Sequence, residues 1–466
     1  MKRKEENLLY LIFISIVAAL GGFLFGYDTA VISGTVTQVV DQFGLDSIQT
    51  GWFVGSALIG SIAGVSSGGM ISDRIGRKKS MILAAFLFTI SALGCAISAS
   101  FSQLVIYRVI GGIGIGMVSI ISPMYISELS VPRYRGSLVS LYQLAITIGF
   151  LGAYLVNFRL LNFSTSTYAP ESLLLQKIFI QEVWRSMFGA EALPAAAFLL
   201  VIFFIPESPR WLVVRRDENG AFRILQRIFR NQEHVRAQIQ EIKSLAGEKN
   251  KSEWKQIREP GLLRAILIGA AIAILGQFMG VNAVLYYGPK IFEDSGLSSG
   301  DSLYYQVLVG LVNALTTVVA LIIIDRVGRK QLVYWGVSGM ILALLAIGFY
   351  FTLSEKLGLS SGFLLAFFLF YIFCTAISIS AVIFVFLSEL YPTRVRGLAM
   401  SVAGLSLWVG TYLIGQLTPW MLETLGPAGT FFLFAGMCLP YMWIIWKKVP
   451  ETAGKSLEEI ERTWIR

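Results

Sequence analysis

The sequence predicts an all-α membrane protein with twelve transmembrane helices in two pseudo-symmetric six-helix bundles. Of its 466 residues, 55% are hydrophobic and only 14% are charged, and the mean hydropathy is +0.68. Apolar runs of about 20 residues, the length that crosses a bilayer, recur twelve times along the chain. Polar motifs of the first half return at equivalent places in the second half. Because soluble domains carry about 25% charged residues, this composition argues against a soluble enzyme.

The twelve apolar runs are separated by charged stretches or by stretches marked with Gly and Pro. Lipid offers exposed backbone groups no hydrogen-bond partner, and the runs are too long for barrel strands, so each predicts a helix. The first six expected spans are Leu8–Gly26, Trp52–Ile71, Met81–Ile97, Leu104–Tyr125, Leu138–Val156 and Met187–Ile205. The second six are Ala265–Tyr287, Tyr305–Ile324, Leu332–Leu353, Phe363–Leu387, Leu398–Leu417 and Ala428–Trp446.

The distribution of positive charge predicts the orientation. If the basic N-terminus is cytoplasmic, only five of the 38 Lys and Arg residues fall in outer loops, and Arg108 lies within a span. The positive-inside rule then predicts a multi-pass cell-membrane protein with both termini in the cytoplasm. The net charge of +9 needs no nucleic acid to explain it. Three isolated cysteines and one histidine lack metal-ligand spacing, so we expect neither a metal site nor a cofactor.

The longest polar stretch divides the chain. We expect an N-terminal bundle over residues 1–205, a cytoplasmic linker over 206–264, a C-terminal bundle over 265–446 and a cytoplasmic tail over 447–466. Apolar residues recur at helical spacing in the linker, which predicts short amphipathic helices there. A basic solvated linker and a functional latch between the bundles both fit this pattern.

Three motifs are duplicated. The string Asp73–Lys78, DRIGRK, returns as DRVGRK after the eighth span, and Ser127-Glu128-Leu129 returns as Ser388-Glu389-Leu390. Pro206-Glu207-Ser208 after the sixth span has its counterpart, Pro450-Glu451-Thr452, after the twelfth. Two homologous bundles with a site between them at the membrane midplane are typical of transporters that work by alternating access.

These strings resemble the sugar porter family of the major facilitator superfamily over about Gly21 to Glu459. Further matching strings are GGFLFGYD from Gly21, PESPRWL from Pro206, Gln277-Phe278 with Asn282, and PETAGK from Pro450. Within the family, the chain is similar to the bacterial proton-coupled xylose transporter. The resemblance implies the major facilitator fold and a monomer that imports a neutral monosaccharide, pentose or hexose, with a proton across the lipid bilayer. A passive sugar or polyol uniporter and a non-transporting sugar sensor remain open alternatives. The sequence does not place a nucleophile, a base and an orienting group together, which argues against an enzyme.

Ionisable residues inside the apolar runs mark the expected coupling site. Asp28 ends the first run and Arg108 lies early in the fourth. A charge in the bilayer costs several kcal/mol, so such residues usually pair and face a cavity. By resemblance, Asp28 takes the proton, Arg108 is its partner and Glu191 assists. The alternatives are an ion pair that never titrates and an interfacial position for Glu191.

The polar residues within the spans are mostly amides, which donate and accept hydrogen bonds as a sugar hydroxyl does. Aromatic faces suit the C–H faces of a sugar. By resemblance, the sugar-binding residues are Phe23, Gln143, Gln277, Asn282, Tyr286, Asn313 and Trp408. A lone amide is also often interhelical glue. Gly276, Phe384 and Leu407 depart from the family pattern, which leaves the particular sugar undetermined.

Charged residues at the cytoplasmic ends of the helices form the expected gate. Exposed ion pairs contribute only about 0 to 1 kcal/mol each, so a network of them biases a two-state equilibrium without locking it. By resemblance, the network contains Arg74, Arg77, Glu128, Arg135, Glu207, Arg326, Arg329, Glu389 and Arg396. The alternative is that these charges only set topology.

Overall fold

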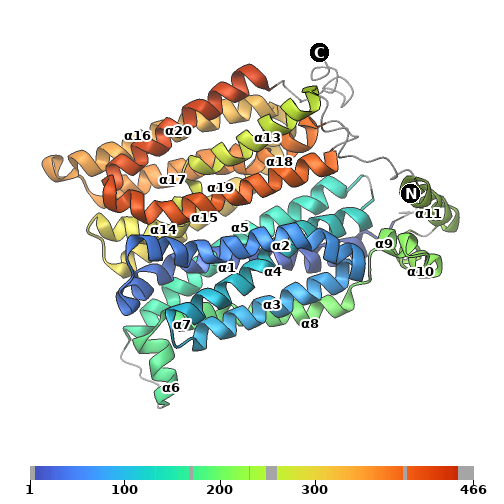
Figure 1. Cartoon of the computed structure of the whole chain (residues 1–466), viewed down its shortest axis with the longest axis horizontal. Helices are drawn as coiled ribbons and strands as arrows, with labels where there is room; N and C mark the ends of the chain where they lie inside the picture. Colours follow the sequence, from blue (N-terminus) through green and yellow to red (C-terminus); the bar gives the residue numbers. More distant parts are fainter. Residues whose placement is uncertain are drawn as a thin grey trace. The chain divides into compact units, whose positions relative to one another are not determined.

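The computed structural model describes residues 6–131, 133–166, 172–229, 231–247, 260–391 and 396–449, and every regular element in these ranges is a helix (Figure 1). The first half contains α1 (Leu8–Phe43), α2 (Ser47–Ile75), α3 (Arg77–Ile97), α4 (Phe101–Leu129), α5 (Arg135–Ser164), α6 (Leu173–Gln176), the π-helix η1 (Lys177–Gln181), α7 (Trp184–Ala190), α8 (Ala192–Val201) and the 3-10 helix η2 (Ile202–Phe204). Then follow α9 (Pro209–Val214), α10 (Glu218–Ile228), α11 (Gln232–Gly247), α13 (Pro260–Phe278), α14 (Val281–Asp294), α15 (Ser299–Val327), α16 (Arg329–Leu357), α17 (Ser361–Ile377), α18 (Ile379–Leu390), α19 (Arg396–Thr424) and α20 (Gly426–Lys448).

The predicted all-α membrane architecture is confirmed. In the described part of the chain, 11 helical segments are long and apolar enough to cross a bilayer. The twelfth pass is the shorter apolar helix α17 followed directly by α18. Most helices extend beyond the apolar runs that predicted them, because a helix continues into polar residues until a cap or turn ends it.

The sequence predicted that the first span ends at Asp28, and the structure shows that it does not. Helix α1 continues without a break to Phe43, so Asp28 lies within it. The predicted apolar run stops at Gly26, just before the charged Asp28, but the backbone keeps its helical hydrogen bonds. The charge is tolerated there because Arg108 pairs with it.

Three predicted continuous spans are interrupted. The seventh breaks between α13 and α14 at Gly280, whose φ of 88° is in the left-handed region and whose missing Cβ leaves room for the Phe434 ring. The tenth breaks at Ser378, whose hydroxyl donates to the Cys374 carbonyl at 2.5 Å. The sixth breaks at Glu191, between α7 and α8. Apolar composition predicts a span but carries no signal for these local breaks.

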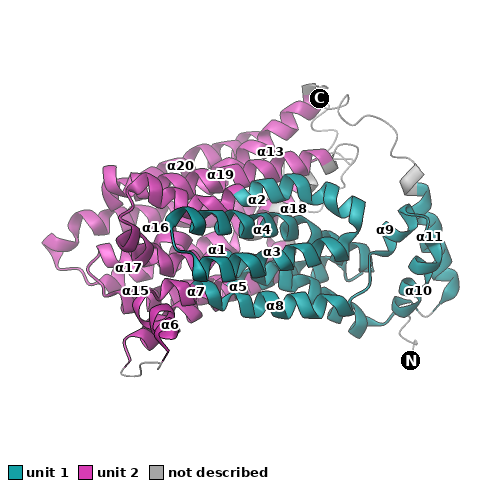
Figure 2. Ribbon diagram, turned by 60° about the horizontal axis from the view of Figure 1, so that its bottom comes forward, with its two compact units in different colours: residues 1–28, 60–149, 188–251 teal, residues 29–59, 150–187, 252–466 magenta. Residues whose placement is uncertain are grey.

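The chain divides into two compact units (Figure 2). Unit 1 comprises residues 1–28, 60–149 and 188–251, and unit 2 comprises residues 29–59, 150–187 and 252–466. This division follows packing density and cuts across α1, α2, α5 and α7. The sequence division at 205, 264 and 446 follows the motif duplication instead, and it remains a prediction.

Small residues bring helices of unit 1 together. Gly64 of α2 lies against α4, where a Cβ on it would be 2.9 Å from the Gly116 Cα. Gly22 of α1 lies against Tyr142 of α5, and a Cβ there would be 2.8 Å from the Tyr142 carbonyl oxygen. The glycines of the GGFLFGYD string therefore serve close helix packing, which needs backbones to approach one another.

In the described part of the predicted linker up to residue 247, the chain forms α9, α10 and α11. Asp217 caps α10 by accepting from the Gly220 backbone N–H at 2.9 Å, and Leu225 and Ile228 form its buried face. The N-terminal segment pairs with this region, since the Asn7 N–H donates to the Ile228 carbonyl at 2.8 Å. The amphipathic pattern of the sequence thus corresponds to helices packed within unit 1.

Candidate functional site

A buried ion pair joins α1 to α4 in unit 1. Arg108 Nη1 donates to Asp28 Oδ1 and also lies 3.4 Å from the Asp28 carbonyl oxygen. The two side chains are 2% and 1% exposed. The guanidinium also lies over the Phe188 ring, 5.3 Å from its centroid. The structure therefore brings together the two residues that the sequence selected as an intramembrane pair.

The pair leaves hydrogen-bonding capacity unused. Among the described residues, Asp28 Oδ2, Arg108 Nε and both carboxyl oxygens of Glu191 are buried without a hydrogen-bond partner. Glu191 is 1% exposed and lies close enough to interact electrostatically with both Asp28 and Arg108. We call Asp28, Arg108 and Glu191 the acidic triad.

The acidic triad contains two carboxyl groups and one guanidinium. If both carboxyl groups are ionised, one negative charge is uncompensated in a region without water contact, which is costly. One proton on either carboxyl group restores neutrality. Chemically, the cluster is therefore a place to hold and release a proton.

A glycine and a serine make room for the triad. Gly111 of α4 faces Asp28, and a Cβ at Gly111 would be 3.3 Å from Asp28 Oδ2 and would collide with Ser91 Oγ. The Ser91 hydroxyl donates to the Tyr107 carbonyl at 2.8 Å, which holds α3 to α4 beside the pair. Sequence reasoning missed both positioning residues, because they carry no charge.

An amide cluster lies in unit 2, where α13, α14 and α19 meet. Gln277 Oε1 accepts from Asn282 Nδ2 at 2.7 Å and from the Thr411 hydroxyl at 3.1 Å. We call Gln277, Asn282 and Thr411 the amide cluster. The sequence predicted two of its members and missed Thr411, which lies three residues after Trp408 on α19. Residues three apart on a helix lie on the same face, so the spacing between Trp408 and Thr411 was the signal that could have found Thr411.

The other predicted sugar contacts are placed as follows. Tyr286 and Trp408 are buried at 2% and 7% exposure in unit 2. Asn313 of α15 is half-buried, and among the described residues no hydrogen bond joins its side chain to the amide cluster. Phe23 and Gln143 are half-buried on α1 and α5 in unit 1.

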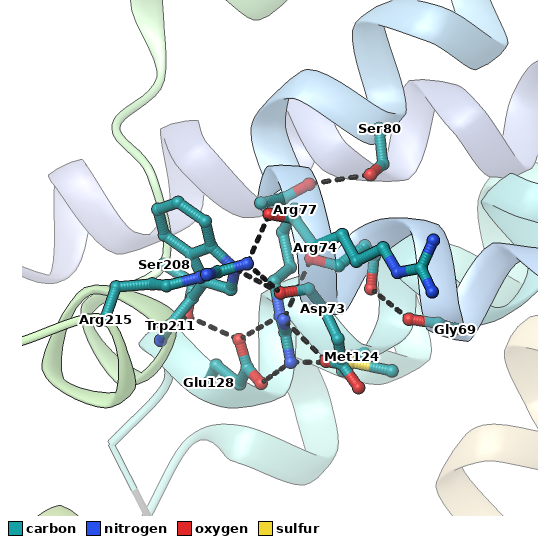
Figure 3. A network of polar contacts seen from close by, with 12 residues as sticks. Gly69, Asp73, Arg74, Arg77, Ser80, Met124, Glu128, Ser208, Trp211 and Arg215 are labelled. Atoms are coloured by element: carbon teal, nitrogen blue, oxygen red, sulfur yellow. Dashed lines mark hydrogen bonds and ion pairs between the residues drawn. The ribbon is translucent and has the colours of Figure 1, made fainter.

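A second polar network lies at the junction of α2, α3, α4 and α9 in unit 1 (Figure 3). Arg77 binds Glu128 through Nε and Nη2, both at 3.1 Å, and binds the Asp73 carboxylate at 2.9 Å. The Ser208 hydroxyl donates to Glu128 at 2.5 Å. Glu207 caps α3 by accepting from the Arg77 backbone N–H at 2.8 Å. We call these five residues the Arg77 network.

Two further predicted gate residues of the first half contribute less. Among the described residues, Arg74 contributes its carbonyl oxygen and no side-chain hydrogen bond, and that carbonyl accepts from Arg215 Nη2 at 2.6 Å. Trp211 donates to the Asp73 carbonyl at 3.0 Å, so α9 is bound to the end of α2 (Figure 3). Arg135 is exposed at the start of α5. Asp73, Ser208, Trp211 and Arg215 were not among the predicted gate residues, although the first three lie within the quoted motifs.

The equivalent network of the second half is only partly described. Arg329 Nη1 lies 3.4 Å from the Ile324 carbonyl oxygen. Lys330 Nζ donates to the carbonyls of Trp446 and Val449 at 3.3 and 3.0 Å, which binds α16 to the end of α20. The side chains of Arg326, Glu389 and Arg396 lie outside the described part of the chain.

Unit 2 also joins helices from the two halves of the sequence. The Thr37 hydroxyl of α1 donates to Glu293 of α14 at 2.9 Å, and Gln416 Nε2 of α19 donates to the Ile48 carbonyl of α2 at 2.9 Å. The Tyr154 hydroxyl of α5 donates to the Leu285 carbonyl at 2.9 Å. Thr37 lies near the end of α1, Ile48 at the start of α2 and Tyr154 in the second half of α5. Sequence reasoning predicted none of these contacts.

The membrane-spanning helices of the described chain, a buried cluster of two carboxyl groups and one guanidinium, and a separate amide cluster fit a membrane transporter. The family model described as Sugar (and other) transporter matches residues 14–464. The chain therefore belongs to the sugar transporter family, which confirms the resemblance carried by its motifs.

Similar proteins cover the same length. The arabinose-proton symporter of Bacillus subtilis (strain 168) is 37% identical, with 99% of this chain and 97% of that protein covered. The D-xylose-proton symporter of Escherichia coli (strain K12) is 35% identical, with 99% and 97% covered. The inward open structure of the xylose transporter from E. coli matches with a TM-score of 0.83 at 34% identity, covering 97% of this chain and 100% of that chain.

Proposed function

We propose that this protein is a secondary active transporter that imports a neutral monosaccharide, a pentose or a hexose, together with a proton by alternating access. Family membership and the names of two similar proteins, both sugar-proton symporters, support the sugar and the proton. The observation that best supports the proposal is the acidic triad. Among the described residues, only one carboxylate oxygen of Asp28 has a hydrogen-bond partner, and neither oxygen of Glu191 has one.

The triad couples the proton to rearrangement through competition for Asp28. When Asp28 is ionised, Arg108 binds it and holds α1 to α4. A proton on Asp28 cancels its charge and weakens that bond, which frees α1 to move relative to α4. Glu191 takes part as the second carboxyl group, which accepts the proton or the partner that Asp28 gives up.

Sugar recognition is assigned to the amide cluster with its aromatic neighbours. Gln277 and Asn282 already bind one another, so a sugar hydroxyl that replaces this contact receives a donor and an acceptor together. Tyr286 and Trp408 supply apolar faces from α14 and α19. Phe23, Gln143 and Asn313 complete the proposed contact set on the basis of family resemblance.

We assign residues 1–205 and 265–446 to the two bundles, 206–264 to the cytoplasmic linker and 447–466 to the cytoplasmic tail, with the protein in the cell membrane and functional as a monomer. In this orientation the Arg77 network lies on the cytoplasmic side. The contacts of Thr37 with Glu293 and of Gln416 with Ile48 lie on the outer side and tie the two halves together there.

The test is uptake by the purified protein in liposomes. A panel of pentoses, hexoses and cyclic polyols is offered with and without a protonophore. We expect accumulation of one or a few sugars that the protonophore abolishes. Uptake that equilibrates but never accumulates sugar, with or without a proton gradient, would establish the passive uniporter instead.

An Asp28→Asn variant isolates the coupling step. We expect it to lose accumulation and to keep sugar exchange across the membrane, because the neutral side chain mimics the protonated form. Asp41→Asn is the matched control, since Asp41 lies on the same helix but is exposed. Undiminished uphill uptake by Asp28→Asn would contradict the proposal.

A further inference from the structure

A groove with a cavity volume of about 480 Å³ lies between α13 and α20 in unit 2. Its walls are apolar side chains, including Leu267 and Ile268 from α13 and Trp443 and Ile444 from α20. Leu267 and Trp443 are 59% and 52% exposed, so the groove opens to the surface of the unit. In a pair of helices long and apolar enough to cross a membrane, such an apolar opening suits lipid chains better than water.

Two positive charges stand at one end of this groove. Arg264 lies near the start of α13 and Lys448 is the last residue of α20, and both line the cavity. Among the described residues, neither takes part in an ion pair. Lys448 is not required to cap α20, because Lys330 already binds the carbonyls of Trp446 and Val449.

We propose that the groove binds one anionic glycerophospholipid, with an acyl chain along the apolar wall and the phosphate between Arg264 and Lys448. Charge complementarity carries the assignment, because two cations without an ion-pair partner among the described residues, at the end of an apolar groove, attract an anionic headgroup. A volume of about 480 Å³ is in the usual range for a site that binds a molecule of moderate size.

Two observations favour the cytoplasmic leaflet as the source of this lipid. Lys447 and Trp446 are exposed beside Lys448, so an aromatic and a cationic residue stand where a helix leaves the hydrocarbon region. With the proposed orientation, this end of α13 and α20 is cytoplasmic, and anionic lipids concentrate there. The bound lipid then joins the start of α13 to the end of α20 and steadies two helices that flank the amide cluster and its break at Gly280.

The test uses the purified full chain and native mass spectrometry with two probes, palmitoyl-oleoyl phosphatidylglycerol and palmitoyl-oleoyl phosphatidylethanolamine. We expect one phosphatidylglycerol to be retained in preference to phosphatidylethanolamine. Arg264→Gln and Lys448→Gln are each expected to weaken its Kd about fivefold, because each removes a cation that lines the groove and contacts the proposed phosphate position. Lys447→Gln is the matched control and leaves the Kd unchanged, because Lys447 does not line the groove.

A second readout locates the lipid. Brominated phosphatidylglycerol quenches the fluorescence of nearby tryptophan residues. The difference in quenching between the unmodified protein and Trp443→Phe therefore reports lipid bound in the groove. In the Arg264→Gln and Lys448→Gln double variant, we expect Trp443→Phe to cause no further loss of quenching, while the unfolding temperature and sugar exchange measured in the absence of phosphatidylglycerol stay unchanged. Equal retention of the two lipids, an equal effect of Lys447→Gln, or a protein dimer that covers Trp443 without lipid would each overturn the proposal.

Discussion

Replacing Glu128 with Gln tests whether burial sets the strength of the Arg77 network. Arg77 pairs with Glu128, whose side chain is 5% exposed, and with Asp73, whose side chain is 72% exposed. Breaking a buried pair by removing one charge costs about 3 to 5 kcal/mol, because the other charge remains buried. The Asp73 carboxylate still faces Arg77, and the new amide keeps one acceptor. We therefore expect Glu128→Gln to lower the free energy of unfolding by about 2 to 3 kcal/mol.

The matched variant is Asp73→Asn. The Asp73 pair with Arg77 is as short as the Glu128 pair, but its exposed partner is screened by water, so we expect a loss of about 0 to 1 kcal/mol. Ser208→Ala removes the hydrogen bond to the Glu128 carboxylate and the cap that Ser208 provides to the Trp211 N–H, so it is expected to cost about 2 to 3 kcal/mol. Unfolding of the detergent-solubilised protein by denaturant, followed by tryptophan fluorescence, measures all three. Equal losses for Glu128→Gln and Asp73→Asn would refute the reasoning from burial.

Three further predictions concern other parts of the molecule. Gly26→Leu is expected to abolish transport and lower thermal stability, because any side chain there collides with the Ile146 carbonyl; a normal unfolding temperature would contradict this close packing. Thr411→Val removes one hydrogen bond to the amide cluster and is expected to raise the sugar KM several-fold at unchanged proton dependence, measured by initial uptake rates. Burial alone would raise the pKa of Glu182, but the hydrogen bond and charge of Arg185 outweigh burial and hold that pKa below its ordinary value of 4.5. The stabilisation by Glu182 is therefore complete above about pH 4.5 and is lost as the pH falls through the lowered pKa. Glu182→Gln should flatten the stability curve below about pH 4.5, and an unchanged curve there would contradict the assignment.

The number of membrane passes was predictable because it depends on composition alone. A run such as Leu104–Tyr125 has the length and hydropathy of a span wherever its neighbours lie. The ends were less predictable, since α1 runs on through Asp28 to Phe43 although the apolar run stops at Gly26. A charge ends an apolar run, whereas a helix ends only where its backbone finds another partner.

The membership of the acidic triad was predictable, and its geometry was not. Ionisable residues within spans are rare, so Asp28, Arg108 and Glu191 were conspicuous in the sequence. Which oxygen is paired depends on the side chains that surround the pair, including the space left by Gly111. Polar residues that lack charge, such as Thr411, do not stand out among the many Ser and Thr residues of membrane helices.

The breaks in the spans were the least predictable feature. Gly280 has a left-handed φ, but glycine is frequent in membrane helices and most of it serves packing, as Gly64 does. Ser378 interrupts the tenth span without any glycine or proline at that position. Only the packing of the neighbouring helices decides which small residue becomes a break.

The most direct test of proton coupling is the movement of protons when sugar is added. Liposomes that contain the purified protein and an internal pH dye are given an inward sugar gradient, with no proton gradient imposed. We predict that the lumen acidifies as sugar enters, that Asp28→Asn shows sugar exchange without acidification, and that Asp41→Asn behaves like the unmodified protein. Sugar entry with no change in internal pH in the unmodified protein would contradict the assignment of the acidic triad as the proton-carrying site.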